Sequence, residues 1–333
     1  MKTIYILSIG KLYRGKNGLY FINKDKKKSP IPLESIKEIF ILNKVSVTYN
    51  ALKLLADRNI PIHFFYENTK KGISYYLGSF LPRQKTKSGL VLVKQVEAYK
   101  DIEKRTEIAL EIVDAIRYNC IKVLEKYHID EVKELRKIDV WKMFEESLND
   151  WKDAINIIRG IESNIWNLFY QGLDKILKLY KLERRTRRPP KNEANTIVSF
   201  ANTLLYGVTL TEIYKTHLDP TISFLHELRD TRYSLALDLS ENFKPIITFR
   251  ILIWLVNQGI IKDTHFVKGL NGVLLNEQGK KLVIKEFNKR LDETIKLKSG
   301  LKRSMRWYIK AQAYNLERFL LDGRKFKAFR LIY

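Results

Sequence analysis

Four polar side chains of this chain lie among apolar residues, where an unpaired charge is very costly. Glu162 belongs to the stretch INIIRGIESNIWNLFYQGL, and His226, Asp238 and Glu241 belong to the stretch 218–247. Two or three carboxylates with a single imidazole suit Mg²⁺ or Mn²⁺ better than structural zinc. A divalent cation held in this way offsets the repulsion between carboxylates and a phosphodiester and stabilises the attacking or leaving oxygen. These residues therefore indicate a site for metal-assisted phosphodiester chemistry.

Each of these residues also has a plainer explanation. Glu162 shares an apolar helix face with its i−4 and i+4 neighbours, and a buried ion pair with an arginine would satisfy it. A lone histidine near the end of a helix, as expected for His226, is more often structural than a ligand. Asp238 and Glu241 stand at i and i+3 near an expected helix N-terminus, where the helix dipole stabilises negative charge. The four residues together are stronger evidence for a metal site than any one of them alone.

Apolar residues at helical spacing predict that residues 90–333 form a mostly α-helical domain that positions these side chains. Within it, Asp219-Pro220 is a good helix start and Ser234 can cap the next helix. Helices are expected at 93–128 (one long helix or two in series) and around 139–147, 151–180, 195–215, 220–228, 235–258, 277–297 and 302–320.

Residues 1–82 are expected to form a small N-terminal β domain, β-sandwich-like and with one short helix. Short runs rich in Ile, Tyr and Phe predict strands: KTIYILS, GLYFIN, KEIFIL, IPIHFFY and ISYYLGSFL. The turn signals RGKNG and KKKSPIP separate some of these strands, and TYNALKLLADRNI predicts the short helix. Residues 83–89 are the best candidate for a linker. The predicted fold class is therefore α+β, with the β domain followed by a larger helical catalytic domain.

The chain is strongly basic, with 61 Lys+Arg against 37 Asp+Glu in 333 residues and a formal net charge of +24. Such a field favours polyanions, although ordinary solvated lysines would give the same balance. The single cysteine, Cys120, excludes an internal disulfide framework and a multi-cysteine zinc site. A signal peptide and an uninterrupted apolar run of membrane-spanning length are both missing, so a cytoplasmic protein with no membrane partner is expected.

Four arginines crowd one short loop, which Pro189-Pro190 prevents from continuing as a helix: Arg184, Arg185, Arg187 and Arg188. Their guanidinium groups could clamp DNA phosphates bidentately, or they could pair with acidic residues of the middle of the chain. The segment 300–333 mixes Trp and Tyr with Lys and Arg, which suits nucleic acid but also an amphipathic helix that packs its rings inward.

Taken in order, these motifs resemble a known family. The glutamate of "GIE", the loop "RRTRRPP" followed by Asn195, "SF" and "LLYG", then "LDP…FLHE" and "LALDLSE.FKPII" are similar to the CRISPR-associated integrase-endonuclease of the spacer-acquisition machinery. The resemblance covers the whole chain, although residues 1–82 match by their β character rather than by motif. The family often has Asp-Pro before this asparagine, whereas this chain has Asn192-Glu193-Ala194 before Asn195.

The resemblance implies a site and partners. Glu162, His226 and Glu241 would be the metal ligands, with Asp238 and Asn195 in supporting positions and Mg²⁺ or Mn²⁺ as cofactor. The protein would act as a homodimer that joins a small CRISPR-associated companion protein and binds double-stranded DNA. Each 3′-OH of a short duplex would attack a phosphodiester of the CRISPR array, and His226 would act either as a ligand or as general acid to the leaving oxygen.

Two other classes of function stay open on the residues alone. One is an unrelated metal-dependent nuclease or recombinase, which a strand-transfer assay would separate from an integrase. The other is a non-enzymatic nucleic-acid-binding scaffold whose acidic residues only pair with arginines. A role at a membrane surface is weaker, because the basic residues are not confined to one amphipathic helix.

Overall fold

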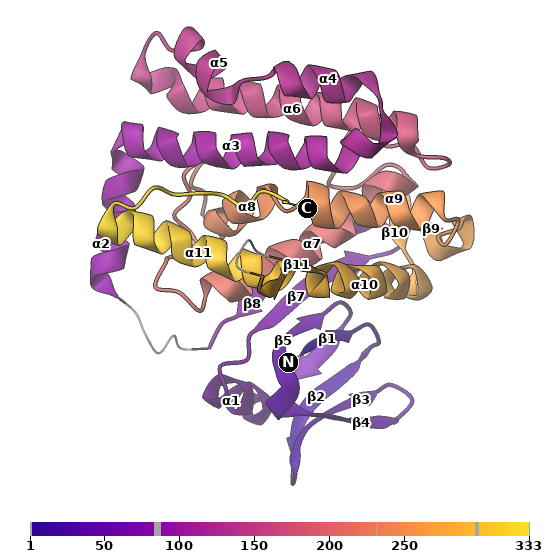
Figure 1. Ribbon diagram of the computed structural model, residues 1–333. Coiled ribbons are helices and arrows are strands. Elements are labelled where there is room, and N and C mark those ends of the chain that lie inside the picture. The colour runs from indigo at the N-terminus through magenta and orange to yellow at the C-terminus, as the bar shows by residue number, and fades with distance from the viewer. Residues whose placement is uncertain (1, 83–87, 231, 297–299, 333) are drawn as a thin grey trace.

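The computed structural model describes residues 2–82, 88–230, 232–296 and 300–332. It has a strand-rich part at one end and a larger helical part that extends away from it (Figure 1). The predicted α+β class, with strands first and helices after, is confirmed. Residues 83–87 of the predicted linker lie outside the described residues, and the domain limits stay predictions.

Two four-stranded sheets make up the strand-rich part. The first has the order β1 (Lys2–Ile6), β5 (Ile36–Ile41), β7 (Ile62–Asn68), β8 (Ile73–Phe80), and the second β4 (Lys28–Ile31), β3 (Gly18–Asn23), β2 (Gly10–Gly15), β6 (Val45–Val47). In the first sheet β1, β5 and β7 run parallel and β8 antiparallel. Helix α1 (Tyr49–Asp57) is the predicted short helix, and its N-cap Thr48 accepts a hydrogen bond from the backbone of Ala51.

Three of these strands, β2, β4 and β6, were missed by the sequence analysis, which took much of the first two as turns. Strand β4 contains Pro30, which has no N–H to donate, yet β4 is an edge strand and pairs only with β3. An edge position therefore reconciles a proline with a strand.

Ten helices follow α1 in the described part of the chain: α2 (Gly89–Lys100), α3 (Ile102–Leu124), α4 (Asp130–Lys137), α5 (Val140–Ser147), α6 (Ala154–Ile176), α7 (Glu193–Ile213), α8 (Ser234–Glu241), α9 (Arg250–Asn257), α10 (Glu277–Asp292) and α11 (Met305–Asp322). The region 93–128 forms two helices in series, and the side chain of Asp101 caps the second by accepting from Lys104 N at 3.2 Å. Two small hairpins, β9 (Phe266–Lys268) with β10 (Val273–Leu275) and β11 (Thr294–Lys296) with β12 (Lys302–Ser304), complete the elements.

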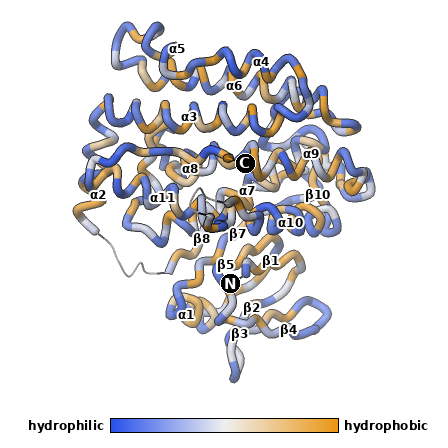
Figure 2. Tube along the Cα trace, in the orientation of Figure 1, coloured by the Kyte–Doolittle hydropathy of each residue, from blue (hydrophilic) through white to orange (hydrophobic). Residues whose placement is uncertain are grey.

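The helices are arranged in layers. Helices α4, α5 and α6 lie farthest from the sheets, α3 lies next, and α7 to α11 lie between α3 and the strands (Figure 1). Apolar and polar residues alternate along α3 and α6 (Figure 2), as expected for helices that bury one face. Within the described residues, no helix is both long and apolar enough to cross a membrane.

Two predicted helices are wrong. Residues 220–228 are not helical, and Asp219 instead closes a turn by accepting from Thr221 N at 2.8 Å. The predicted helix 235–258 is broken after α8, because Pro245 cannot donate to a preceding carbonyl and the chain continues as a π-helical turn, Pro245–Phe249, before α9. Ser234 does not cap α8: its hydroxyl lies 3.5 Å from the carbonyl oxygen of Glu227.

A buried polar network joins the sheets to the helices. Arg306 of α11 donates to Glu38 of β5 at 2.7 Å and to Glu212 of α7 at 3.3 Å. His63 of β7 contacts Ser79 of β8 at 2.5 Å and Thr211 of α7 at 2.9 Å. Apolar side chains such as Phe40 and Phe65 continue from the sheet into the helical core.

Backbone also meets backbone at one place. The turn of the β7–β8 hairpin lies against the β9–β10 turn, where Leu270 N donates to Lys70 O at 3.1 Å. A Cβ atom on Gly72, whose φ is +65°, would lie 2.5 Å from the carbonyl oxygen of Gly272. Gly272 in turn lies against Pro190, so the β7–β8 hairpin, the β9–β10 hairpin and the end of the arginine loop form one junction.

Candidate active site

Glu162 lies on α6, one turn before an aromatic cluster. Its carboxylate accepts a hydrogen bond from the indole Nε1 of Trp166 at 3.2 Å, and Trp166 packs on Phe169, Tyr170 and Phe249. The predicted apolar stripe on this helix is confirmed, because Ile158, Ile161 and Ile165 are all buried. The stripe anchors α6 in the core, which holds the partly buried carboxylate of Glu162 in place.

Asp238 of α8 organises the irregular segment that carries His226. Its fully buried carboxylate accepts three consecutive backbone N–H groups, from Phe224 at 2.6 Å, Leu225 at 2.9 Å and His226 at 3.1 Å. It also meets the imidazole Nδ1 of His226 at 2.7 Å. When Nδ1 carries the proton, Nε2 is left free to bind a cation or to exchange a proton. Asp238 therefore sets both the backbone and the ring of His226.

Glu241 lies one turn further along α8 and is 5% exposed. Its Oε1 atom is 3.9 Å from Nε2 of His226, and the ammonium group of Lys244 pairs with the same oxygen. The structure thus holds Glu241 and Asp238 of α8 against His226, and the charges of Glu241 and His226 act on Glu162 of α6. Their assignment as metal ligands stays a prediction.

The charges of this cluster act on one another. Burial, together with the negative charge of Glu241, raises the pKa of Glu162 above its ordinary value. Burial opposes protonation of His226, yet the hydrogen bond and charge of Asp238, with Glu241 and Glu162 behind them, raise the pKa of His226. Two carboxylates held near one another in a partly buried place attract a cation, either a protonated group or a metal ion.

The donor set suits a divalent cation. Two ligands of one Mg²⁺ at about 2.1 Å each stand at most about 4.2 Å apart, and the gap between His226 Nε2 and Glu241 Oε1 lies within that limit. Within the described residues, no group of three or more His, Cys, Asp or Glu side chains already surrounds a common point as a metal site. Lys244 pairs with Glu241, so a cation bound at that oxygen would have to displace its ammonium group.

Several residues that hold this site were missed by the sequence analysis. Arg105 of α3 donates to the carbonyl oxygen of Phe224 at 2.9 Å, and Arg159 of α6 donates to that of Leu225 at 3.3 Å. Gln95 of α2 donates to the carbonyl oxygens of Asp219 and Ile222, both at 2.9 Å. Only Arg159 carried a usable signal, because it stands three residues before Glu162 on the same helix.

The four arginines of the loop differ from one another. Arg184, Arg187 and Arg188 are exposed, whereas Arg185 is half-buried and donates to Asn195 at 2.9 Å and to Ser199 at 3.1 Å. Burial lowers the pKa of Arg185 to about 10.

Asn195 of α7 holds the backbone of the same loop. Its amide donates to the carbonyl oxygens of Leu182 and Arg184, both at 3.0 Å, and its carbonyl oxygen accepts from Thr186 N at 2.9 Å. Asn195 therefore fixes the loop without touching the carboxylate cluster, and DNA binding by the arginines stays a prediction.

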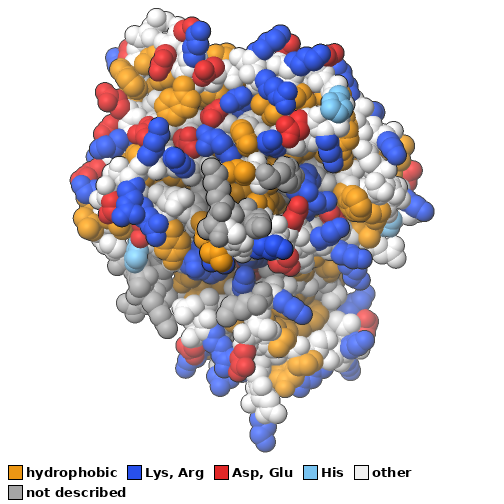
Figure 3. Space-filling view, in the orientation of Figure 1, with side chains coloured by type: hydrophobic (Ala, Val, Ile, Leu, Met, Phe, Trp, Pro, Cys, Tyr) orange, Lys and Arg blue, Asp and Glu red, His pale blue; other side chains and the backbone are white. Residues whose placement is uncertain are grey.

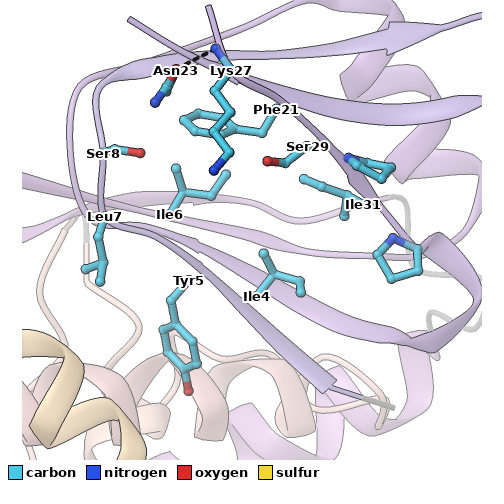
Figure 4. Close-up of a pocket in the computed structure, with 12 residues that line it drawn as sticks. Ile4, Tyr5, Ile6, Leu7, Ser8, Phe21, Asn23, Lys27, Ser29 and Ile31 are labelled. Atoms are coloured by element: carbon cyan, nitrogen blue, oxygen red, sulfur yellow. Dashed lines mark hydrogen bonds between the residues drawn. The ribbon is translucent and has the colours of Figure 1, made fainter. Parts of the chain in front are cut away.

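A separate cavity of about 400 Å³ lies in the strand-rich part, between β1 and the β3–β4 hairpin (Figure 4). Ile4, Phe21 and Ile31 line it, and Lys27 reaches over it (Figure 4). None of its lining residues belongs to the carboxylate cluster.

Lys and Arg side chains cover both the strand-rich and the helical parts of the face drawn in Figure 3, with Asp and Glu among them. A polyanion would thus find cations along much of this face.

Comparisons with known proteins identify the family. The family model described as "CRISPR associated protein Cas1" matches residues 4–289. Curated relatives named CRISPR-associated endonucleases are 40% identical, one from Thermodesulfovibrio yellowstonii over 98% of both chains and one from Methanocaldococcus jannaschii over 98% of this chain and 97% of its own.

Solved structures agree. A Cas1 protein from Thermotoga maritima is 35% identical and superposes with a TM-score of 0.85, covering 99% of this chain and 100% of its own. A casposase bound to integration product shares the fold, with a TM-score of 0.77 over 100% of this chain and 96% of its own, at 19% identity. The family resemblance found in the sequence is confirmed, and the chain belongs to the family of the CRISPR-associated protein Cas1.

Proposed function

We propose that this Cas1-family endonuclease is a metal-dependent DNA integrase, which inserts short duplexes into a CRISPR array by attack of a 3′-OH on a phosphodiester. The observation that carries the proposal is the pairing of His226 with Glu241, with Asp238 fixing the imidazole and Glu162 near enough to feel the charge of Glu241. A cluster of partly buried carboxylates in a protein of net charge +24 is the arrangement in which a divalent cation and a nucleic acid can meet.

Glu162, His226 and Glu241 would hold Mg²⁺ or Mn²⁺. When bound, the ion supplies a Lewis acid that stabilises the charge developing on the phosphate and on the oxygens around it. In the transesterification, a P–O bond forms to the attacking 3′ oxygen, whose proton is lost, and the P–O bond to the leaving oxygen breaks, which takes up a proton. The reaction therefore needs groups that orient the reacting oxygens and that accept and donate protons.

His226 can serve this reaction in either of two roles. As a ligand it presents Nε2, because Asp238 engages Nδ1. As general acid it would deliver a proton from Nε2 to the leaving oxygen, which the raised pKa of His226 favours at neutral pH. Lys244 pairs with Glu241, so its ammonium group would compete with the cation for that carboxylate.

The surrounding partners follow from the same proposal. The exposed arginines Arg184, Arg187 and Arg188 would contact the DNA backbone, which fixes register without reading bases. The protein would work in the cytoplasm as a homodimer together with a small CRISPR-associated companion protein. A solved complex described as Cas6-RT-Cas1–Cas2 contains a chain with this fold, which is compatible with such an assembly.

A strand-transfer assay tests the proposal. The purified protein, with and without its companion, is incubated with a short 3′-OH duplex and a repeat-bearing plasmid in Mn²⁺, Mg²⁺ or EDTA. Glu162→Ala, His226→Ala and Glu241→Ala run beside it, and Glu146→Ala, an exposed glutamate of α5, is the matched control. Joined products are expected with the wild type and the control, and none with the three variants or with EDTA.

Other outcomes would favour other functions. Nicking or degradation without joining would favour a plain metal-dependent nuclease. DNA binding that is unchanged by EDTA, with no product under any cation, would favour a binding scaffold. Joining by all three variants at the wild-type rate would show that these residues are structural.

A further inference from the structure

The segment after α11 forms an extended strap across the helical part. Helix α11 ends at Asp322, and its C-cap Gly323, with a φ of +66°, turns the chain back on itself. Residues 324–332, coloured yellow, then run between α11 and α3 and over α8 (Figure 1). Phe326, Ala328 and Leu331 are buried, whereas the residues between them include exposed side chains. The strap is therefore packed into the fold rather than lying loosely on it.

Side chains of the helices hold the strap by its backbone. Ala328 N donates to Glu111 of α3 at 2.9 Å, and Leu331 N donates to Asn119 of the same helix at 2.8 Å. Phe329 N donates to Gln312 of α11 at 2.8 Å. All three accepting side chains are buried, so these bonds are shielded from water. Backbone recognition by three buried side chains specifies the path of the strap.

The same side chains hold the end of α8. Asn119 donates to the carbonyl oxygen of Asn242 at 2.7 Å, and Gln312 donates to that of Leu239 at 3.1 Å. The amide of Asn242 donates back to the carbonyl oxygen of Phe329 in the strap at 3.0 Å. Leu239 and Asn242 flank Glu241 in the sequence, so these bonds clamp the backbone on both sides of that carboxylate.

The regular helical hydrogen bonding ends near Glu241. Helix α8 has eight residues and gives way to a turn and then to a π-helical segment. The carbonyl oxygens of Ser240 and Glu241 accept from backbone N–H groups three residues on, whereas those of Leu239 and Asn242 accept from the side chains of Gln312 and Asn119. The rings of Phe243 and Phe329 stack with centroids 5.1 Å apart and an interplanar angle of 7°. Side chains from α3 and α11, together with the strap, thus hold the backbone where α8 ends.

We propose that residues 324–332 are a positioning strap that fixes Glu241 for the reaction, with Asn119, Gln312 and Asn242 as its latch. The inference rests on the proposed function of Glu241 and adds positioning residues to it. None of these residues touches the DNA or the metal in the proposal. Their effect reaches the reaction only through the backbone of Glu241, where small displacements cost much rate.

Arg330 locks the strap to α3. Its guanidinium donates to Glu111 at 2.5 and 3.0 Å and to Asp114 at 2.8 Å. A bidentate pair of this kind fixes direction as well as distance. Arg330→Ala should loosen the strap without altering the carboxylate cluster itself, and Arg330→Lys should keep part of the attraction but not the bidentate geometry.

The test compares Arg330→Ala, Arg330→Lys and Asn242→Ala with a matched control, Arg136→Ala. Arg136 also pairs with a carboxylate, that of Glu125 just after the C-terminal end of α3, and its loss changes the net charge equally. The full-length proteins are checked for folding by thermal unfolding. Three quantities are then measured: the strand-transfer rate at saturating DNA, the Kd for the DNA duplex, and hydrogen exchange of the peptide covering residues 237–249.

Arg330→Ala and Asn242→Ala are expected to lower the saturating rate about tenfold or more, with Kd unchanged within about twofold and faster exchange in 237–249. Arg330→Lys should recover part of the rate, and Arg136→Ala should match the wild type. If folded Arg330→Ala and Asn242→Ala showed the wild-type strand-transfer rate and wild-type hydrogen exchange, the proposal that the strap positions Glu241 would be overturned. If the wild type joins no DNA, the proposed function fails, and unchanged exchange in 237–249 would then refute the strap separately.

Discussion

Replacing Asp238 with asparagine should disrupt the segment that carries His226 while changing hardly any volume. The carboxylate accepts four hydrogen bonds, two on each oxygen: Oδ2 takes the N–H groups of Phe224 and Leu225, and Oδ1 takes the N–H and the ring Nδ1 of His226. A carboxamide has one accepting oxygen, so in either orientation its NH₂ group faces two donors.

The cost follows from that count. Two charge-assisted hydrogen bonds are lost, at about 1.5–3 kcal/mol each, so Asp238→Asn should lower the free energy of unfolding by about 3–6 kcal/mol. Small domains are stable by only about 5–15 kcal/mol, so the effect should be plain in urea unfolding at neutral pH. Hydrogen exchange at residues 224–226 should accelerate, and strand transfer should fall because His226 loses its orientation.

A matched control lies in the same segment. Asp219 is a half-buried aspartate in a turn, and one of its carboxylate oxygens accepts from the backbone N–H and the hydroxyl of Thr221 at 2.8 and 2.5 Å. Asp219→Asn keeps that oxygen and should change the free energy of unfolding by less than about 1 kcal/mol. If Asp238→Asn were as stable as this control, with wild-type exchange at 224–226, the carboxylate would not organise the segment and our reasoning would be wrong.

Three further predictions concern other parts of the molecule. Burial lowers the pKa of His63 to about 4 from its ordinary 6.5, so the unfolded chain binds the proton more readily. The contribution of His63 to the free energy of unfolding should therefore fall by about 2 kcal/mol between pH 7.5 and pH 5. Urea unfolding at both pH values checks this, because the wild type should lose about that much more stability than His63→Gln, whereas equal losses would contradict the lowered pKa. Lys244→Ala removes the ammonium group paired with Glu241, so Mn²⁺ should bind about fivefold more tightly. Calorimetry measures this affinity, and weaker binding by the variant would contradict a competition between Lys244 and the metal ion. Asn195→Ala removes bonds to the backbone of the arginine loop and should cost about 2–4 kcal/mol in urea unfolding, whereas an unchanged midpoint would show that the loop holds itself.

The parts of the fold that depend on local pattern could be predicted from the sequence. The apolar stripe of α6 placed Glu162 correctly, because i±4 spacing fixes which residues share a helix face. The division into strands followed by helices rested likewise on periodicity. The clustering of Glu162 with His226 and Glu241 came from the family resemblance, since no spacing rule brings α6 and α8 together.

The segment around His226 could not be predicted from local pattern. Helical propensity and the Asp219-Pro220 start favoured a helix, but the N–H groups of residues 224–226 bond to Asp238, and Arg105 takes a carbonyl group from the same stretch. Arg105 lies 119 residues from its partner Phe224, and a pattern read in windows of a dozen residues cannot contain such a bond. Hydrogen bonds to residues distant in the sequence therefore determine the backbone conformation of this segment.

The backbone junction at Gly72 and Gly272 also includes Gly269, where an added Cβ would lie 2.4 Å from Gly72 N. It has a consequence for how the protein can vary. A side chain that clashes with another side chain can be relieved by rotation or by a smaller neighbour, but here an added Cβ would meet main chain, which every residue has. No second substitution can restore the lost space, so compensatory pairs are not available at these positions. A library randomised at the three positions and selected for function should return glycine at each of them independently.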